Sequence, residues 1–122
     1  MHTIRLREPW QADWVLEEAN EPCAHYLRKF HMPTGLAANQ SIELVFTPKS
    51  QDAFFAVLND EPLEFSSEPG QMIAILLTGR LKPFNLLKLV VTPSASESQQ
   101  YSQGMRPARL DSLFDVELRI GA

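Results

Sequence analysis

FDVELRI, residues 114–120, carries the strongest structural signal in the sequence. Its four apolar side chains, Phe114, Val116, Leu118 and Ile120, alternate one by one with charged side chains. Successive side chains of a β-strand point to opposite faces, so a strand puts all four on one face, whereas a helix scatters them around its axis. The pattern predicts a strand that buries one face.

The same two-residue period recurs elsewhere in the chain. The segments that show it are residues 4–6, 41–46 and 86–92. Two further apolar stretches, residues 53–58 and 71–77, are shorter than an average helix and predict strands. Because residues 53–58 are apolar on both faces, we expect a central strand that is covered on each side.

The region between Trp10 and Phe30 has a less regular pattern. We interpret residues 13–18 and 24–31 as two strands joined through residues 20–22, where Asn, Glu and Pro favour a turn. A short helix that begins at Trp14 is the alternative for the first of these segments.

Turn residues separate the predicted strands. Asn59 and Asp60 tolerate a left-handed backbone and predict a two-residue hairpin. The other predicted turns are residues 33–35, 47–50, 68–70 and 83–85. Asn59 and Asn85 are expected to bond to the backbone of these turns rather than to a ligand. Replacing Asp60 by glycine should be neutral or stabilising.

Residues 94–112 are polar and lack periodicity, so we expect a long loop that is either a functional flap or locally disordered. The remaining pattern predicts eight or nine short strands in one domain, residues 1–122. This number fits an all-β antiparallel sandwich, with a closed barrel as the alternative.

Composition excludes several classes of function. The formal charge of −4 and the pI near 5.3 argue against nucleic acid and anionic membranes as partners. No apolar run approaches the roughly 20 residues of a spanning helix, and the first residues lack the apolar stretch of a signal peptide. The single cysteine, Cys23, cannot form an internal disulfide, which is compatible with a cytoplasmic location.

Residues 26–92 resemble the jelly-roll, galactose-binding-like domains at the front of β-galactosidases and β-glucuronidases. Those domains have an Asn-Gly hairpin, an Asp-Ile-Thr segment, a turn with leucine, and a final Asn-x-Leu-x-Leu-x-Val strand. The matching segments here are residues 58–60 (LND), 75–78 (ILLT), 81–84 (LKPF) and 85–91 (NLLKLVV). Upstream, residues 28–33 (RKFHMP) resemble the family's basic-aromatic strand end, and residues 41–46 resemble the strand after it.

The sequence departs from this family in two places. Asp60 replaces the usual glycine, and Leu76 and Leu77 stand where an acidic residue is common. The resemblance implies a galactose-binding-like sandwich and a carbohydrate ligand. That fold serves many roles and often acts only as a scaffold.

The sequence offers no clear catalytic or metal site. His25 and His31 are six residues apart, about 20 Å along a strand, which is too far for a common ion. No nucleophile elbow, phosphate-binding glycine loop or dinucleotide motif is present, and we interpret Cys23 as an inert thiol. We therefore expect no enzymatic activity and no cofactor.

Aromatic residues are the candidates for ligand binding, because flat sugar faces stack on aromatic rings. The available side chains are Trp10, Trp14, Tyr26 and Tyr101. The alternative is that the two tryptophans close one end of the sandwich, with their indole N–H groups bonded to backbone carbonyls. Tyr101 is expected to be exposed, next to the hydrogen-bonding side chains of Gln99, Gln100 and Gln103.

Two functions follow from these observations. The first is a non-catalytic β-sandwich module that binds carbohydrate. The alternative is a structural or protein–protein interaction domain that forms a homodimer through residues 54–57 or 72–77.

If the first and last strands lie side by side, Arg5 and Arg7 face Asp115 and Glu117, which accounts for these charges without a partner.

Overall fold

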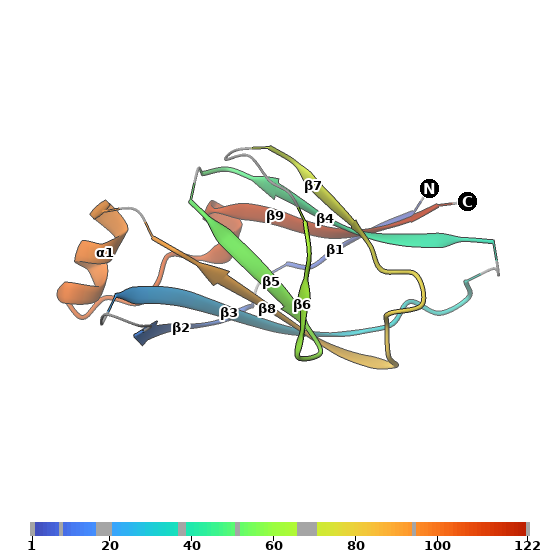
Figure 1. Cartoon of the computed structure of the whole chain (residues 1–122), viewed down its shortest axis with the longest axis horizontal. Coiled ribbons are helices and arrows are strands. Elements are labelled where there is room, and N and C mark those ends of the chain that lie inside the picture. The colour runs from blue at the N-terminus through green and yellow to red at the C-terminus, as the bar shows by residue number, and fades with distance from the viewer. Residues whose placement is uncertain are drawn as a thin grey trace.

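Nine antiparallel strands form two sheets that face each other (Figure 1). The computed structural model describes residues 2–7, 9–16, 21–36, 39–50, 52–65, 71–93 and 95–121, and only the backbone of residues 95–98. The strands within these ranges are β1 (His2–Arg5), β2 (Gln11–Leu16), β3 (Pro22–His31), β4 (Ser41–Pro48), β5 (Phe54–Leu58), β6 (Glu61–Leu63), β7 (Ile73–Leu76), β8 (Phe84–Val91) and β9 (Phe114–Gly121). Because the sheets are separate, the architecture is the predicted sandwich and not a barrel.

The first sheet has the order β1-β9-β4-β7. The two terminal strands lie side by side, with His2 opposite Ile120 and Arg5 opposite Glu117, and both chain ends lie together in Figure 1. In β9 the four alternating apolar residues are buried, as predicted, while Asp115 is exposed on the outer face.

The second sheet has the order β2-β3-β8-β5-β6. β2 and β3 confirm the two strands predicted in the irregular region, and residues 14–16 are strand rather than helix. Residues 17–20, part of the first predicted segment and its connection, lie outside the described residues, as does the turn at 68–70. β4 extends through Pro48 and β8 begins at Phe84, so the turns predicted there are shorter than expected.

Aromatic residues fill one end of the core between the sheets. The ring centroids of Phe54 and Phe114 are 4.5 Å apart, and those of Phe46 and Phe54 are 5.3 Å apart. Phe46 and Phe114 are almost completely buried. Such rings contribute large buried apolar areas, so this cluster joins the two sheets.

The outer face of β5 does not match the prediction for residues 53–58, whereas residues 71–77 contain the predicted strand, β7. β5 lies between β8 and β6, yet Phe55 is 52% exposed, and in the edge strand β7 Leu76 is 59% exposed. The expectation of a strand covered on both faces was wrong, because a two-layer sandwich covers only the inner face of each sheet.

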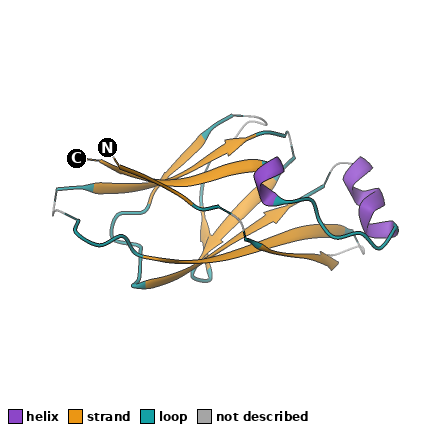
Figure 2. Cartoon of the chain, turned by 180° about the vertical axis from the view of Figure 1, so that it is seen from behind, coloured by secondary structure: helices purple, strands orange, loops and turns teal. Residues whose placement is uncertain are grey.

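The predicted loop at 94–112 is also corrected. It contains the helix α1 (Ala95–Ser102) and the single 3-10 turn η2 (Leu110–Ser112), shown in purple in Figure 2. Gly104, with φ of 74°, ends α1: its N–H donates to the carbonyl of Tyr101, and that of Met105 donates to Gln100. This is a Schellman motif, in which glycine just past the helix adopts a left-handed conformation.

The helices that the structure describes are too short and too polar to cross a membrane.

Candidate functional site

The four aromatic candidates occupy two different environments. Trp10 is 7% exposed and its Nε1 donates to the carbonyl of Leu6 at 3.1 Å. Tyr26 is 1% exposed and its hydroxyl donates to the carbonyl of Ala108 at 2.6 Å. Both rings belong to the core, so Tyr26 presents no ring face to solvent.

Trp14 and Tyr101 contact each other at the α1 end of the second sheet. The Nε1 atom of Trp14 donates to the carbonyl of Met105 at 2.7 Å, and its ring meets that of Tyr101 edge-on with centroids 5.9 Å apart. Both tryptophans thus bond to backbone carbonyls, as the alternative interpretation predicted. Tyr101 is 36% exposed, and Gln99 and Gln103 beside it are exposed too.

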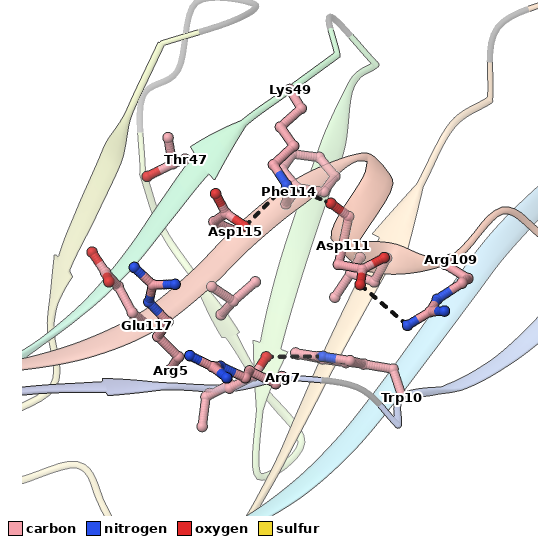
Figure 3. A pocket seen from close by; sticks show the side chains of 13 residues that line it. Arg5, Arg7, Trp10, Thr47, Lys49, Arg109, Asp111, Phe114, Asp115 and Glu117 are labelled. Atoms are coloured by element: carbon pink, nitrogen blue, oxygen red, sulfur yellow. Dashed lines mark hydrogen bonds and ion pairs between the residues drawn. The ribbon is translucent and has the colours of Figure 1, made fainter.

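A concentration of charged groups lies elsewhere, in a pocket of about 550 Å³ that we call the junction pocket. It forms where the chain leaves β1 to cross to β2, between that crossing, η2 and the adjacent ends of β9 and β4 (Figure 3). Its volume is in the range of small-molecule sites. Apolar side chains provide its buried floor: Leu6, Trp10, Leu110, Phe114 and Val116.

Local structure positions the charged rim of this pocket. Leu6 continues the β1 pairing, with its N–H bonded to the carbonyl of Val116, so Arg5 and Arg7 lie on the same side of the extended chain. Leu110, 1% exposed, fixes η2 in the core, so that Arg109 and Asp111 flank the opening.

The acids of the rim are bound to cations. Lys49 Nζ lies 3.2 Å from Asp115 Oδ1 and donates to the carbonyl of Asp111 at 2.7 Å. Arg109 Nη2 lies 3.3 Å from Asp111 Oδ2. The carboxylate of Glu117 is held by Arg119, with 2.6 Å between Oε1 and Nη2. These contacts fix carboxylate oxygens and cationic N–H groups close together around an apolar floor.

The guanidinium of Arg5, in contrast to Lys49 and Arg109, contacts no acid of the rim. Arg5 is opposite Glu117 in the β1–β9 register, as the paired-strand prediction required, but the carboxylate of Glu117 bonds to Arg119. No hydrogen bond or ion pair joins the guanidinium of Arg5 or Arg7 to any residue that the structure describes. Both arginines are exposed.

From the sequence, Arg5, Arg7, Asp115 and Glu117 were predicted only as exposed charges that face each other across two neighbouring strands. Lys49 and Arg109 were not singled out, because they come from distant segments that only the fold brings together. The available signal was indirect: β1 and β9 were expected to be neighbours, and both carry alternating charges.

The remaining polar candidates do not form a site. His25 and His31 lie on one face of β3, as predicted, and His31 meets the ring of Phe84 at 4.8 Å. Among the described residues, no group of three or more His, Cys, Asp or Glu side chains is arranged to hold a metal ion. Cys23 is partly buried and is not part of a disulfide.

Comparison with solved structures finds the same fold in three glycosidases. An FMN-binding β-glucuronidase from Facaelibacterium prausnitzii superposes with a TM-score of 0.66 at 15% identity, over 98% of this chain and 22% of that one. A β-D-mannosidase from Dictyoglomus thermophilum gives 0.66 at 14% identity, over 98% and 22%. A β-glucuronidase from Bifidobacterium dentium gives 0.64 at 14% identity, over 96% and 30%.

No family model and no curated protein matches the sequence. The chain spans less than a third of the length of each of the three enzymes. At this level of identity the likeness concerns the fold, and it confirms the resemblance of the sequence to the jelly-roll domains of this enzyme class. The chain therefore has the galactose-binding-like β-sandwich fold that forms one part of these larger glycosidases.

Proposed function

We propose that this chain is a non-catalytic carbohydrate-binding module and that the junction pocket holds the sugar. The observation that carries the proposal is the chemistry of the pocket, where fixed carboxylate oxygens and cationic N–H groups surround a buried apolar floor. Sugar hydroxyls donate and accept hydrogen bonds at once, so they fit a rim that supplies both kinds of partner. The C–H faces of the sugar fit the apolar floor.

The ion pairs that the acids of the rim form with neighbouring cations support a binding role rather than catalysis. Glycoside hydrolysis needs one carboxyl group to donate a proton and a second to act as base or nucleophile. In the junction pocket Asp111, Asp115 and Glu117 each contact a cation instead. The small share of each glycosidase that the fold spans is in keeping with an accessory role.

A glycan array followed by isothermal titration calorimetry tests this function. Asp115→Ala removes one acceptor of the rim and should weaken binding of the best glycan about tenfold, the effect of losing about 1.4 kcal/mol. Lys88→Ala, which changes a charge on the outer face of the other sheet, should leave the affinity unchanged. Absence of binding to every neutral and acidic glycan on the array would contradict the proposal.

A second candidate function is self-association through the outer face of the five-stranded sheet. Phe84, Phe55 and Leu86 are 73%, 52% and 36% exposed on this face. Phe54 does not belong to it, because its ring packs inward against Phe114, and residues 72–77 belong to the other sheet. Exposed apolar surface of this kind favours a protein partner, and a second copy of the chain presents the same surface.

Sedimentation velocity distinguishes the second candidate from the first. A homodimer that uses this face should dissociate in the Phe84→Ser variant, while glycan binding at the junction pocket should persist. A wild-type chain that stays monomeric up to high concentration would contradict self-association.

A further inference from the structure

Two further hollows adjoin the junction pocket and extend it in opposite directions. A hollow of about 710 Å³ shares Arg5, Arg7 and Glu117 with the junction pocket and continues along the outer face to Arg119. A pocket of about 420 Å³ shares Trp10, Arg109 and Leu110 with it and continues to Arg106 and β2. The three cavities together form an elongated surface path from β9 to β2.

Arginines concentrate along this path. The chain has seven arginines, and five of them line the three cavities: Arg5, Arg7, Arg106, Arg109 and Arg119. We call these five the arginine track. Because the whole chain carries a formal charge of −4, the local excess of cations is a property of this surface and not of the composition.

The positive charge of the track is only partly neutralised. Arg109 and Arg119 contact Asp111 and Glu117. The guanidinium groups of Arg5, Arg7 and Arg106 have no hydrogen-bond or ion-pair partner among the residues that the structure describes. The acids that the structure describes along the path already have partners, so these three guanidinium groups keep their charge uncompensated by any described residue.

Asp13, the acid at the β2 end, accepts a hydrogen bond from Gln11 at 3.2 Å. It therefore has a neutral partner, and among the described residues it forms no ion pair with an arginine of the track.

We infer that the arginine track binds an anionic saccharide chain, one that carries carboxylate or sulfate groups on successive sugars. The inference rests on the proposed carbohydrate-binding function and adds the chemical class of the ligand. Guanidinium groups present a planar fork of N–H donors that matches carboxylate and sulfate oxygens. Arg5 and Arg7, two residues apart on one extended segment, are about 7 Å apart along the chain and can each meet a separate anionic group.

A saccharide fits this surface better than a nucleic acid. Nucleic-acid sites add aromatic faces on which bases stack, or a broad basic footprint on the whole domain. Here Trp10 is 7% exposed, and the whole chain carries a formal charge of −4, so the surface has neither the open aromatic face nor the broad basic footprint of such a site.

Calorimetric titrations with four ligands test the inference. The ligands are an oligogalacturonate, a sulfated galactan oligosaccharide, a neutral galactan oligosaccharide of equal length, and a single-stranded oligonucleotide. The wild-type chain should bind at least one of the two anionic saccharides tenfold or more tightly than the neutral one, and salt should weaken that binding. The stronger of the two anionic ligands identifies carboxylate or sulfate as the natural group.

The Arg5→Gln/Arg7→Gln double variant should lose at least tenfold in affinity for the anionic saccharide, and this loss should exceed the loss for the neutral one, because glutamine keeps N–H donors for hydroxyl groups but carries no charge. The matched control, Arg80→Gln/Lys82→Gln, removes the same charge from exposed side chains that line none of the three cavities and should bind like wild type. Thermal unfolding followed by circular dichroism checks that each variant is folded.

Two results would overturn the inference and leave the proposed function standing: equal affinity for neutral and anionic saccharides, or equal losses of affinity in the two double variants. Binding of the oligonucleotide as strongly as the anionic saccharides would overturn the assignment of the track to saccharides. Failure to bind any of the three saccharides would overturn the inference, and absence of binding to every glycan on the array would overturn the proposed function as well.

Discussion

The side-chain amide of Asn59 donates a hydrogen bond to Oδ1 of Asn85 across 2.9 Å, and this bond joins the β5–β6 hairpin to the start of β8. Asn85 is 3% exposed, and its Oδ1 also accepts from the backbone N–H of Lys82 at 2.9 Å. Its Nδ2 donates to the carbonyl of Lys82 at 2.7 Å. One buried amide thus satisfies three partners.

Replacing Asn85 by alanine should lower the free energy of unfolding by about 1–3 kcal/mol, because it leaves partly buried polar groups of Asn59 and Lys82 without their partners. Urea titration followed by circular dichroism measures the effect. Lys82→Ala keeps the backbone groups that Asn85 bonds and serves as the control, with a change below about 0.5 kcal/mol. An Asn85→Ala variant as stable as wild type would show that water replaces these bonds.

The two hairpin residues should respond oppositely to glycine. Asn59 and Asp60 have φ of 51° and 67°, the left-handed values of a type I′ turn, in which glycine is favoured. Asp60→Gly should leave the free energy of unfolding unchanged or raise it by up to about 1 kcal/mol. Asn59→Gly relieves the same backbone conformation but removes two hydrogen bonds, to Asn85 and to the N–H of Leu86, so it should destabilise.

Differential scanning calorimetry of both variants separates the backbone contribution from the side-chain contribution. A clear loss of melting temperature in Asp60→Gly would mean that Asp60 contributes more through its side chain than through its backbone.

The strands were predictable because their signal is local. The alternation in β9 and the Asn-Asp turn between β5 and β6 each depend only on neighbouring residues. Each can therefore be predicted from its own short stretch of sequence. Phe55 shows the limit of such reasoning: an apolar residue on each face indicates a covered strand, but whether a third layer exists depends on the rest of the chain.

The helix α1 was missed because its sequence is polar and has no apolar stripe. Its one aromatic anchor, Tyr101, packs on Trp14, which is distant in sequence. Gly104 was the overlooked local signal, since glycine just past a polar segment commonly ends a helix. The junction pocket was missed for a related reason, because Arg5, Lys49 and Arg109 meet only after both sheets have formed.

Gly104 should be the most sensitive position of the α1 region. Its φ of 74° suits glycine, and a Cβ built there meets nothing within 4 Å, so the cost of Gly104→Ala is conformational rather than steric. We expect a loss of about 1 kcal/mol and increased hydrogen exchange at the amides of Gly104 and Met105, which close the Schellman motif. Gly121→Ala is the matched control, since its Cβ also meets nothing and its φ is not left-handed. Unchanged exchange at Met105 would contradict the assigned motif.

The ion pair between Lys49 and Asp115 should contribute little to stability, since its side chains are 45% and 62% exposed. Asp115→Asn should change the free energy of unfolding by less than about 1 kcal/mol, because water and salt screen exposed pairs. Chemical denaturation at low and high salt measures this. A larger loss that salt abolishes would assign the pair a structural role in addition to its place on the rim.

The contact between Trp14 and Tyr101 should be visible in fluorescence. Tyr101→Ala removes the ring that meets Trp14 edge-on, so we expect a red-shifted tryptophan emission, stronger quenching by acrylamide, and a loss of about 0.5–1.5 kcal/mol in the free energy of unfolding. Trp10 also emits, but it is 7% exposed and bonds to Leu6 instead. In a Trp14→Phe background, Tyr101→Ala should therefore leave the emission unchanged. A shift that persists in that background would mean that α1 also shields Trp10 from solvent. The helix would then cover a larger area of the sandwich than the area around Trp14.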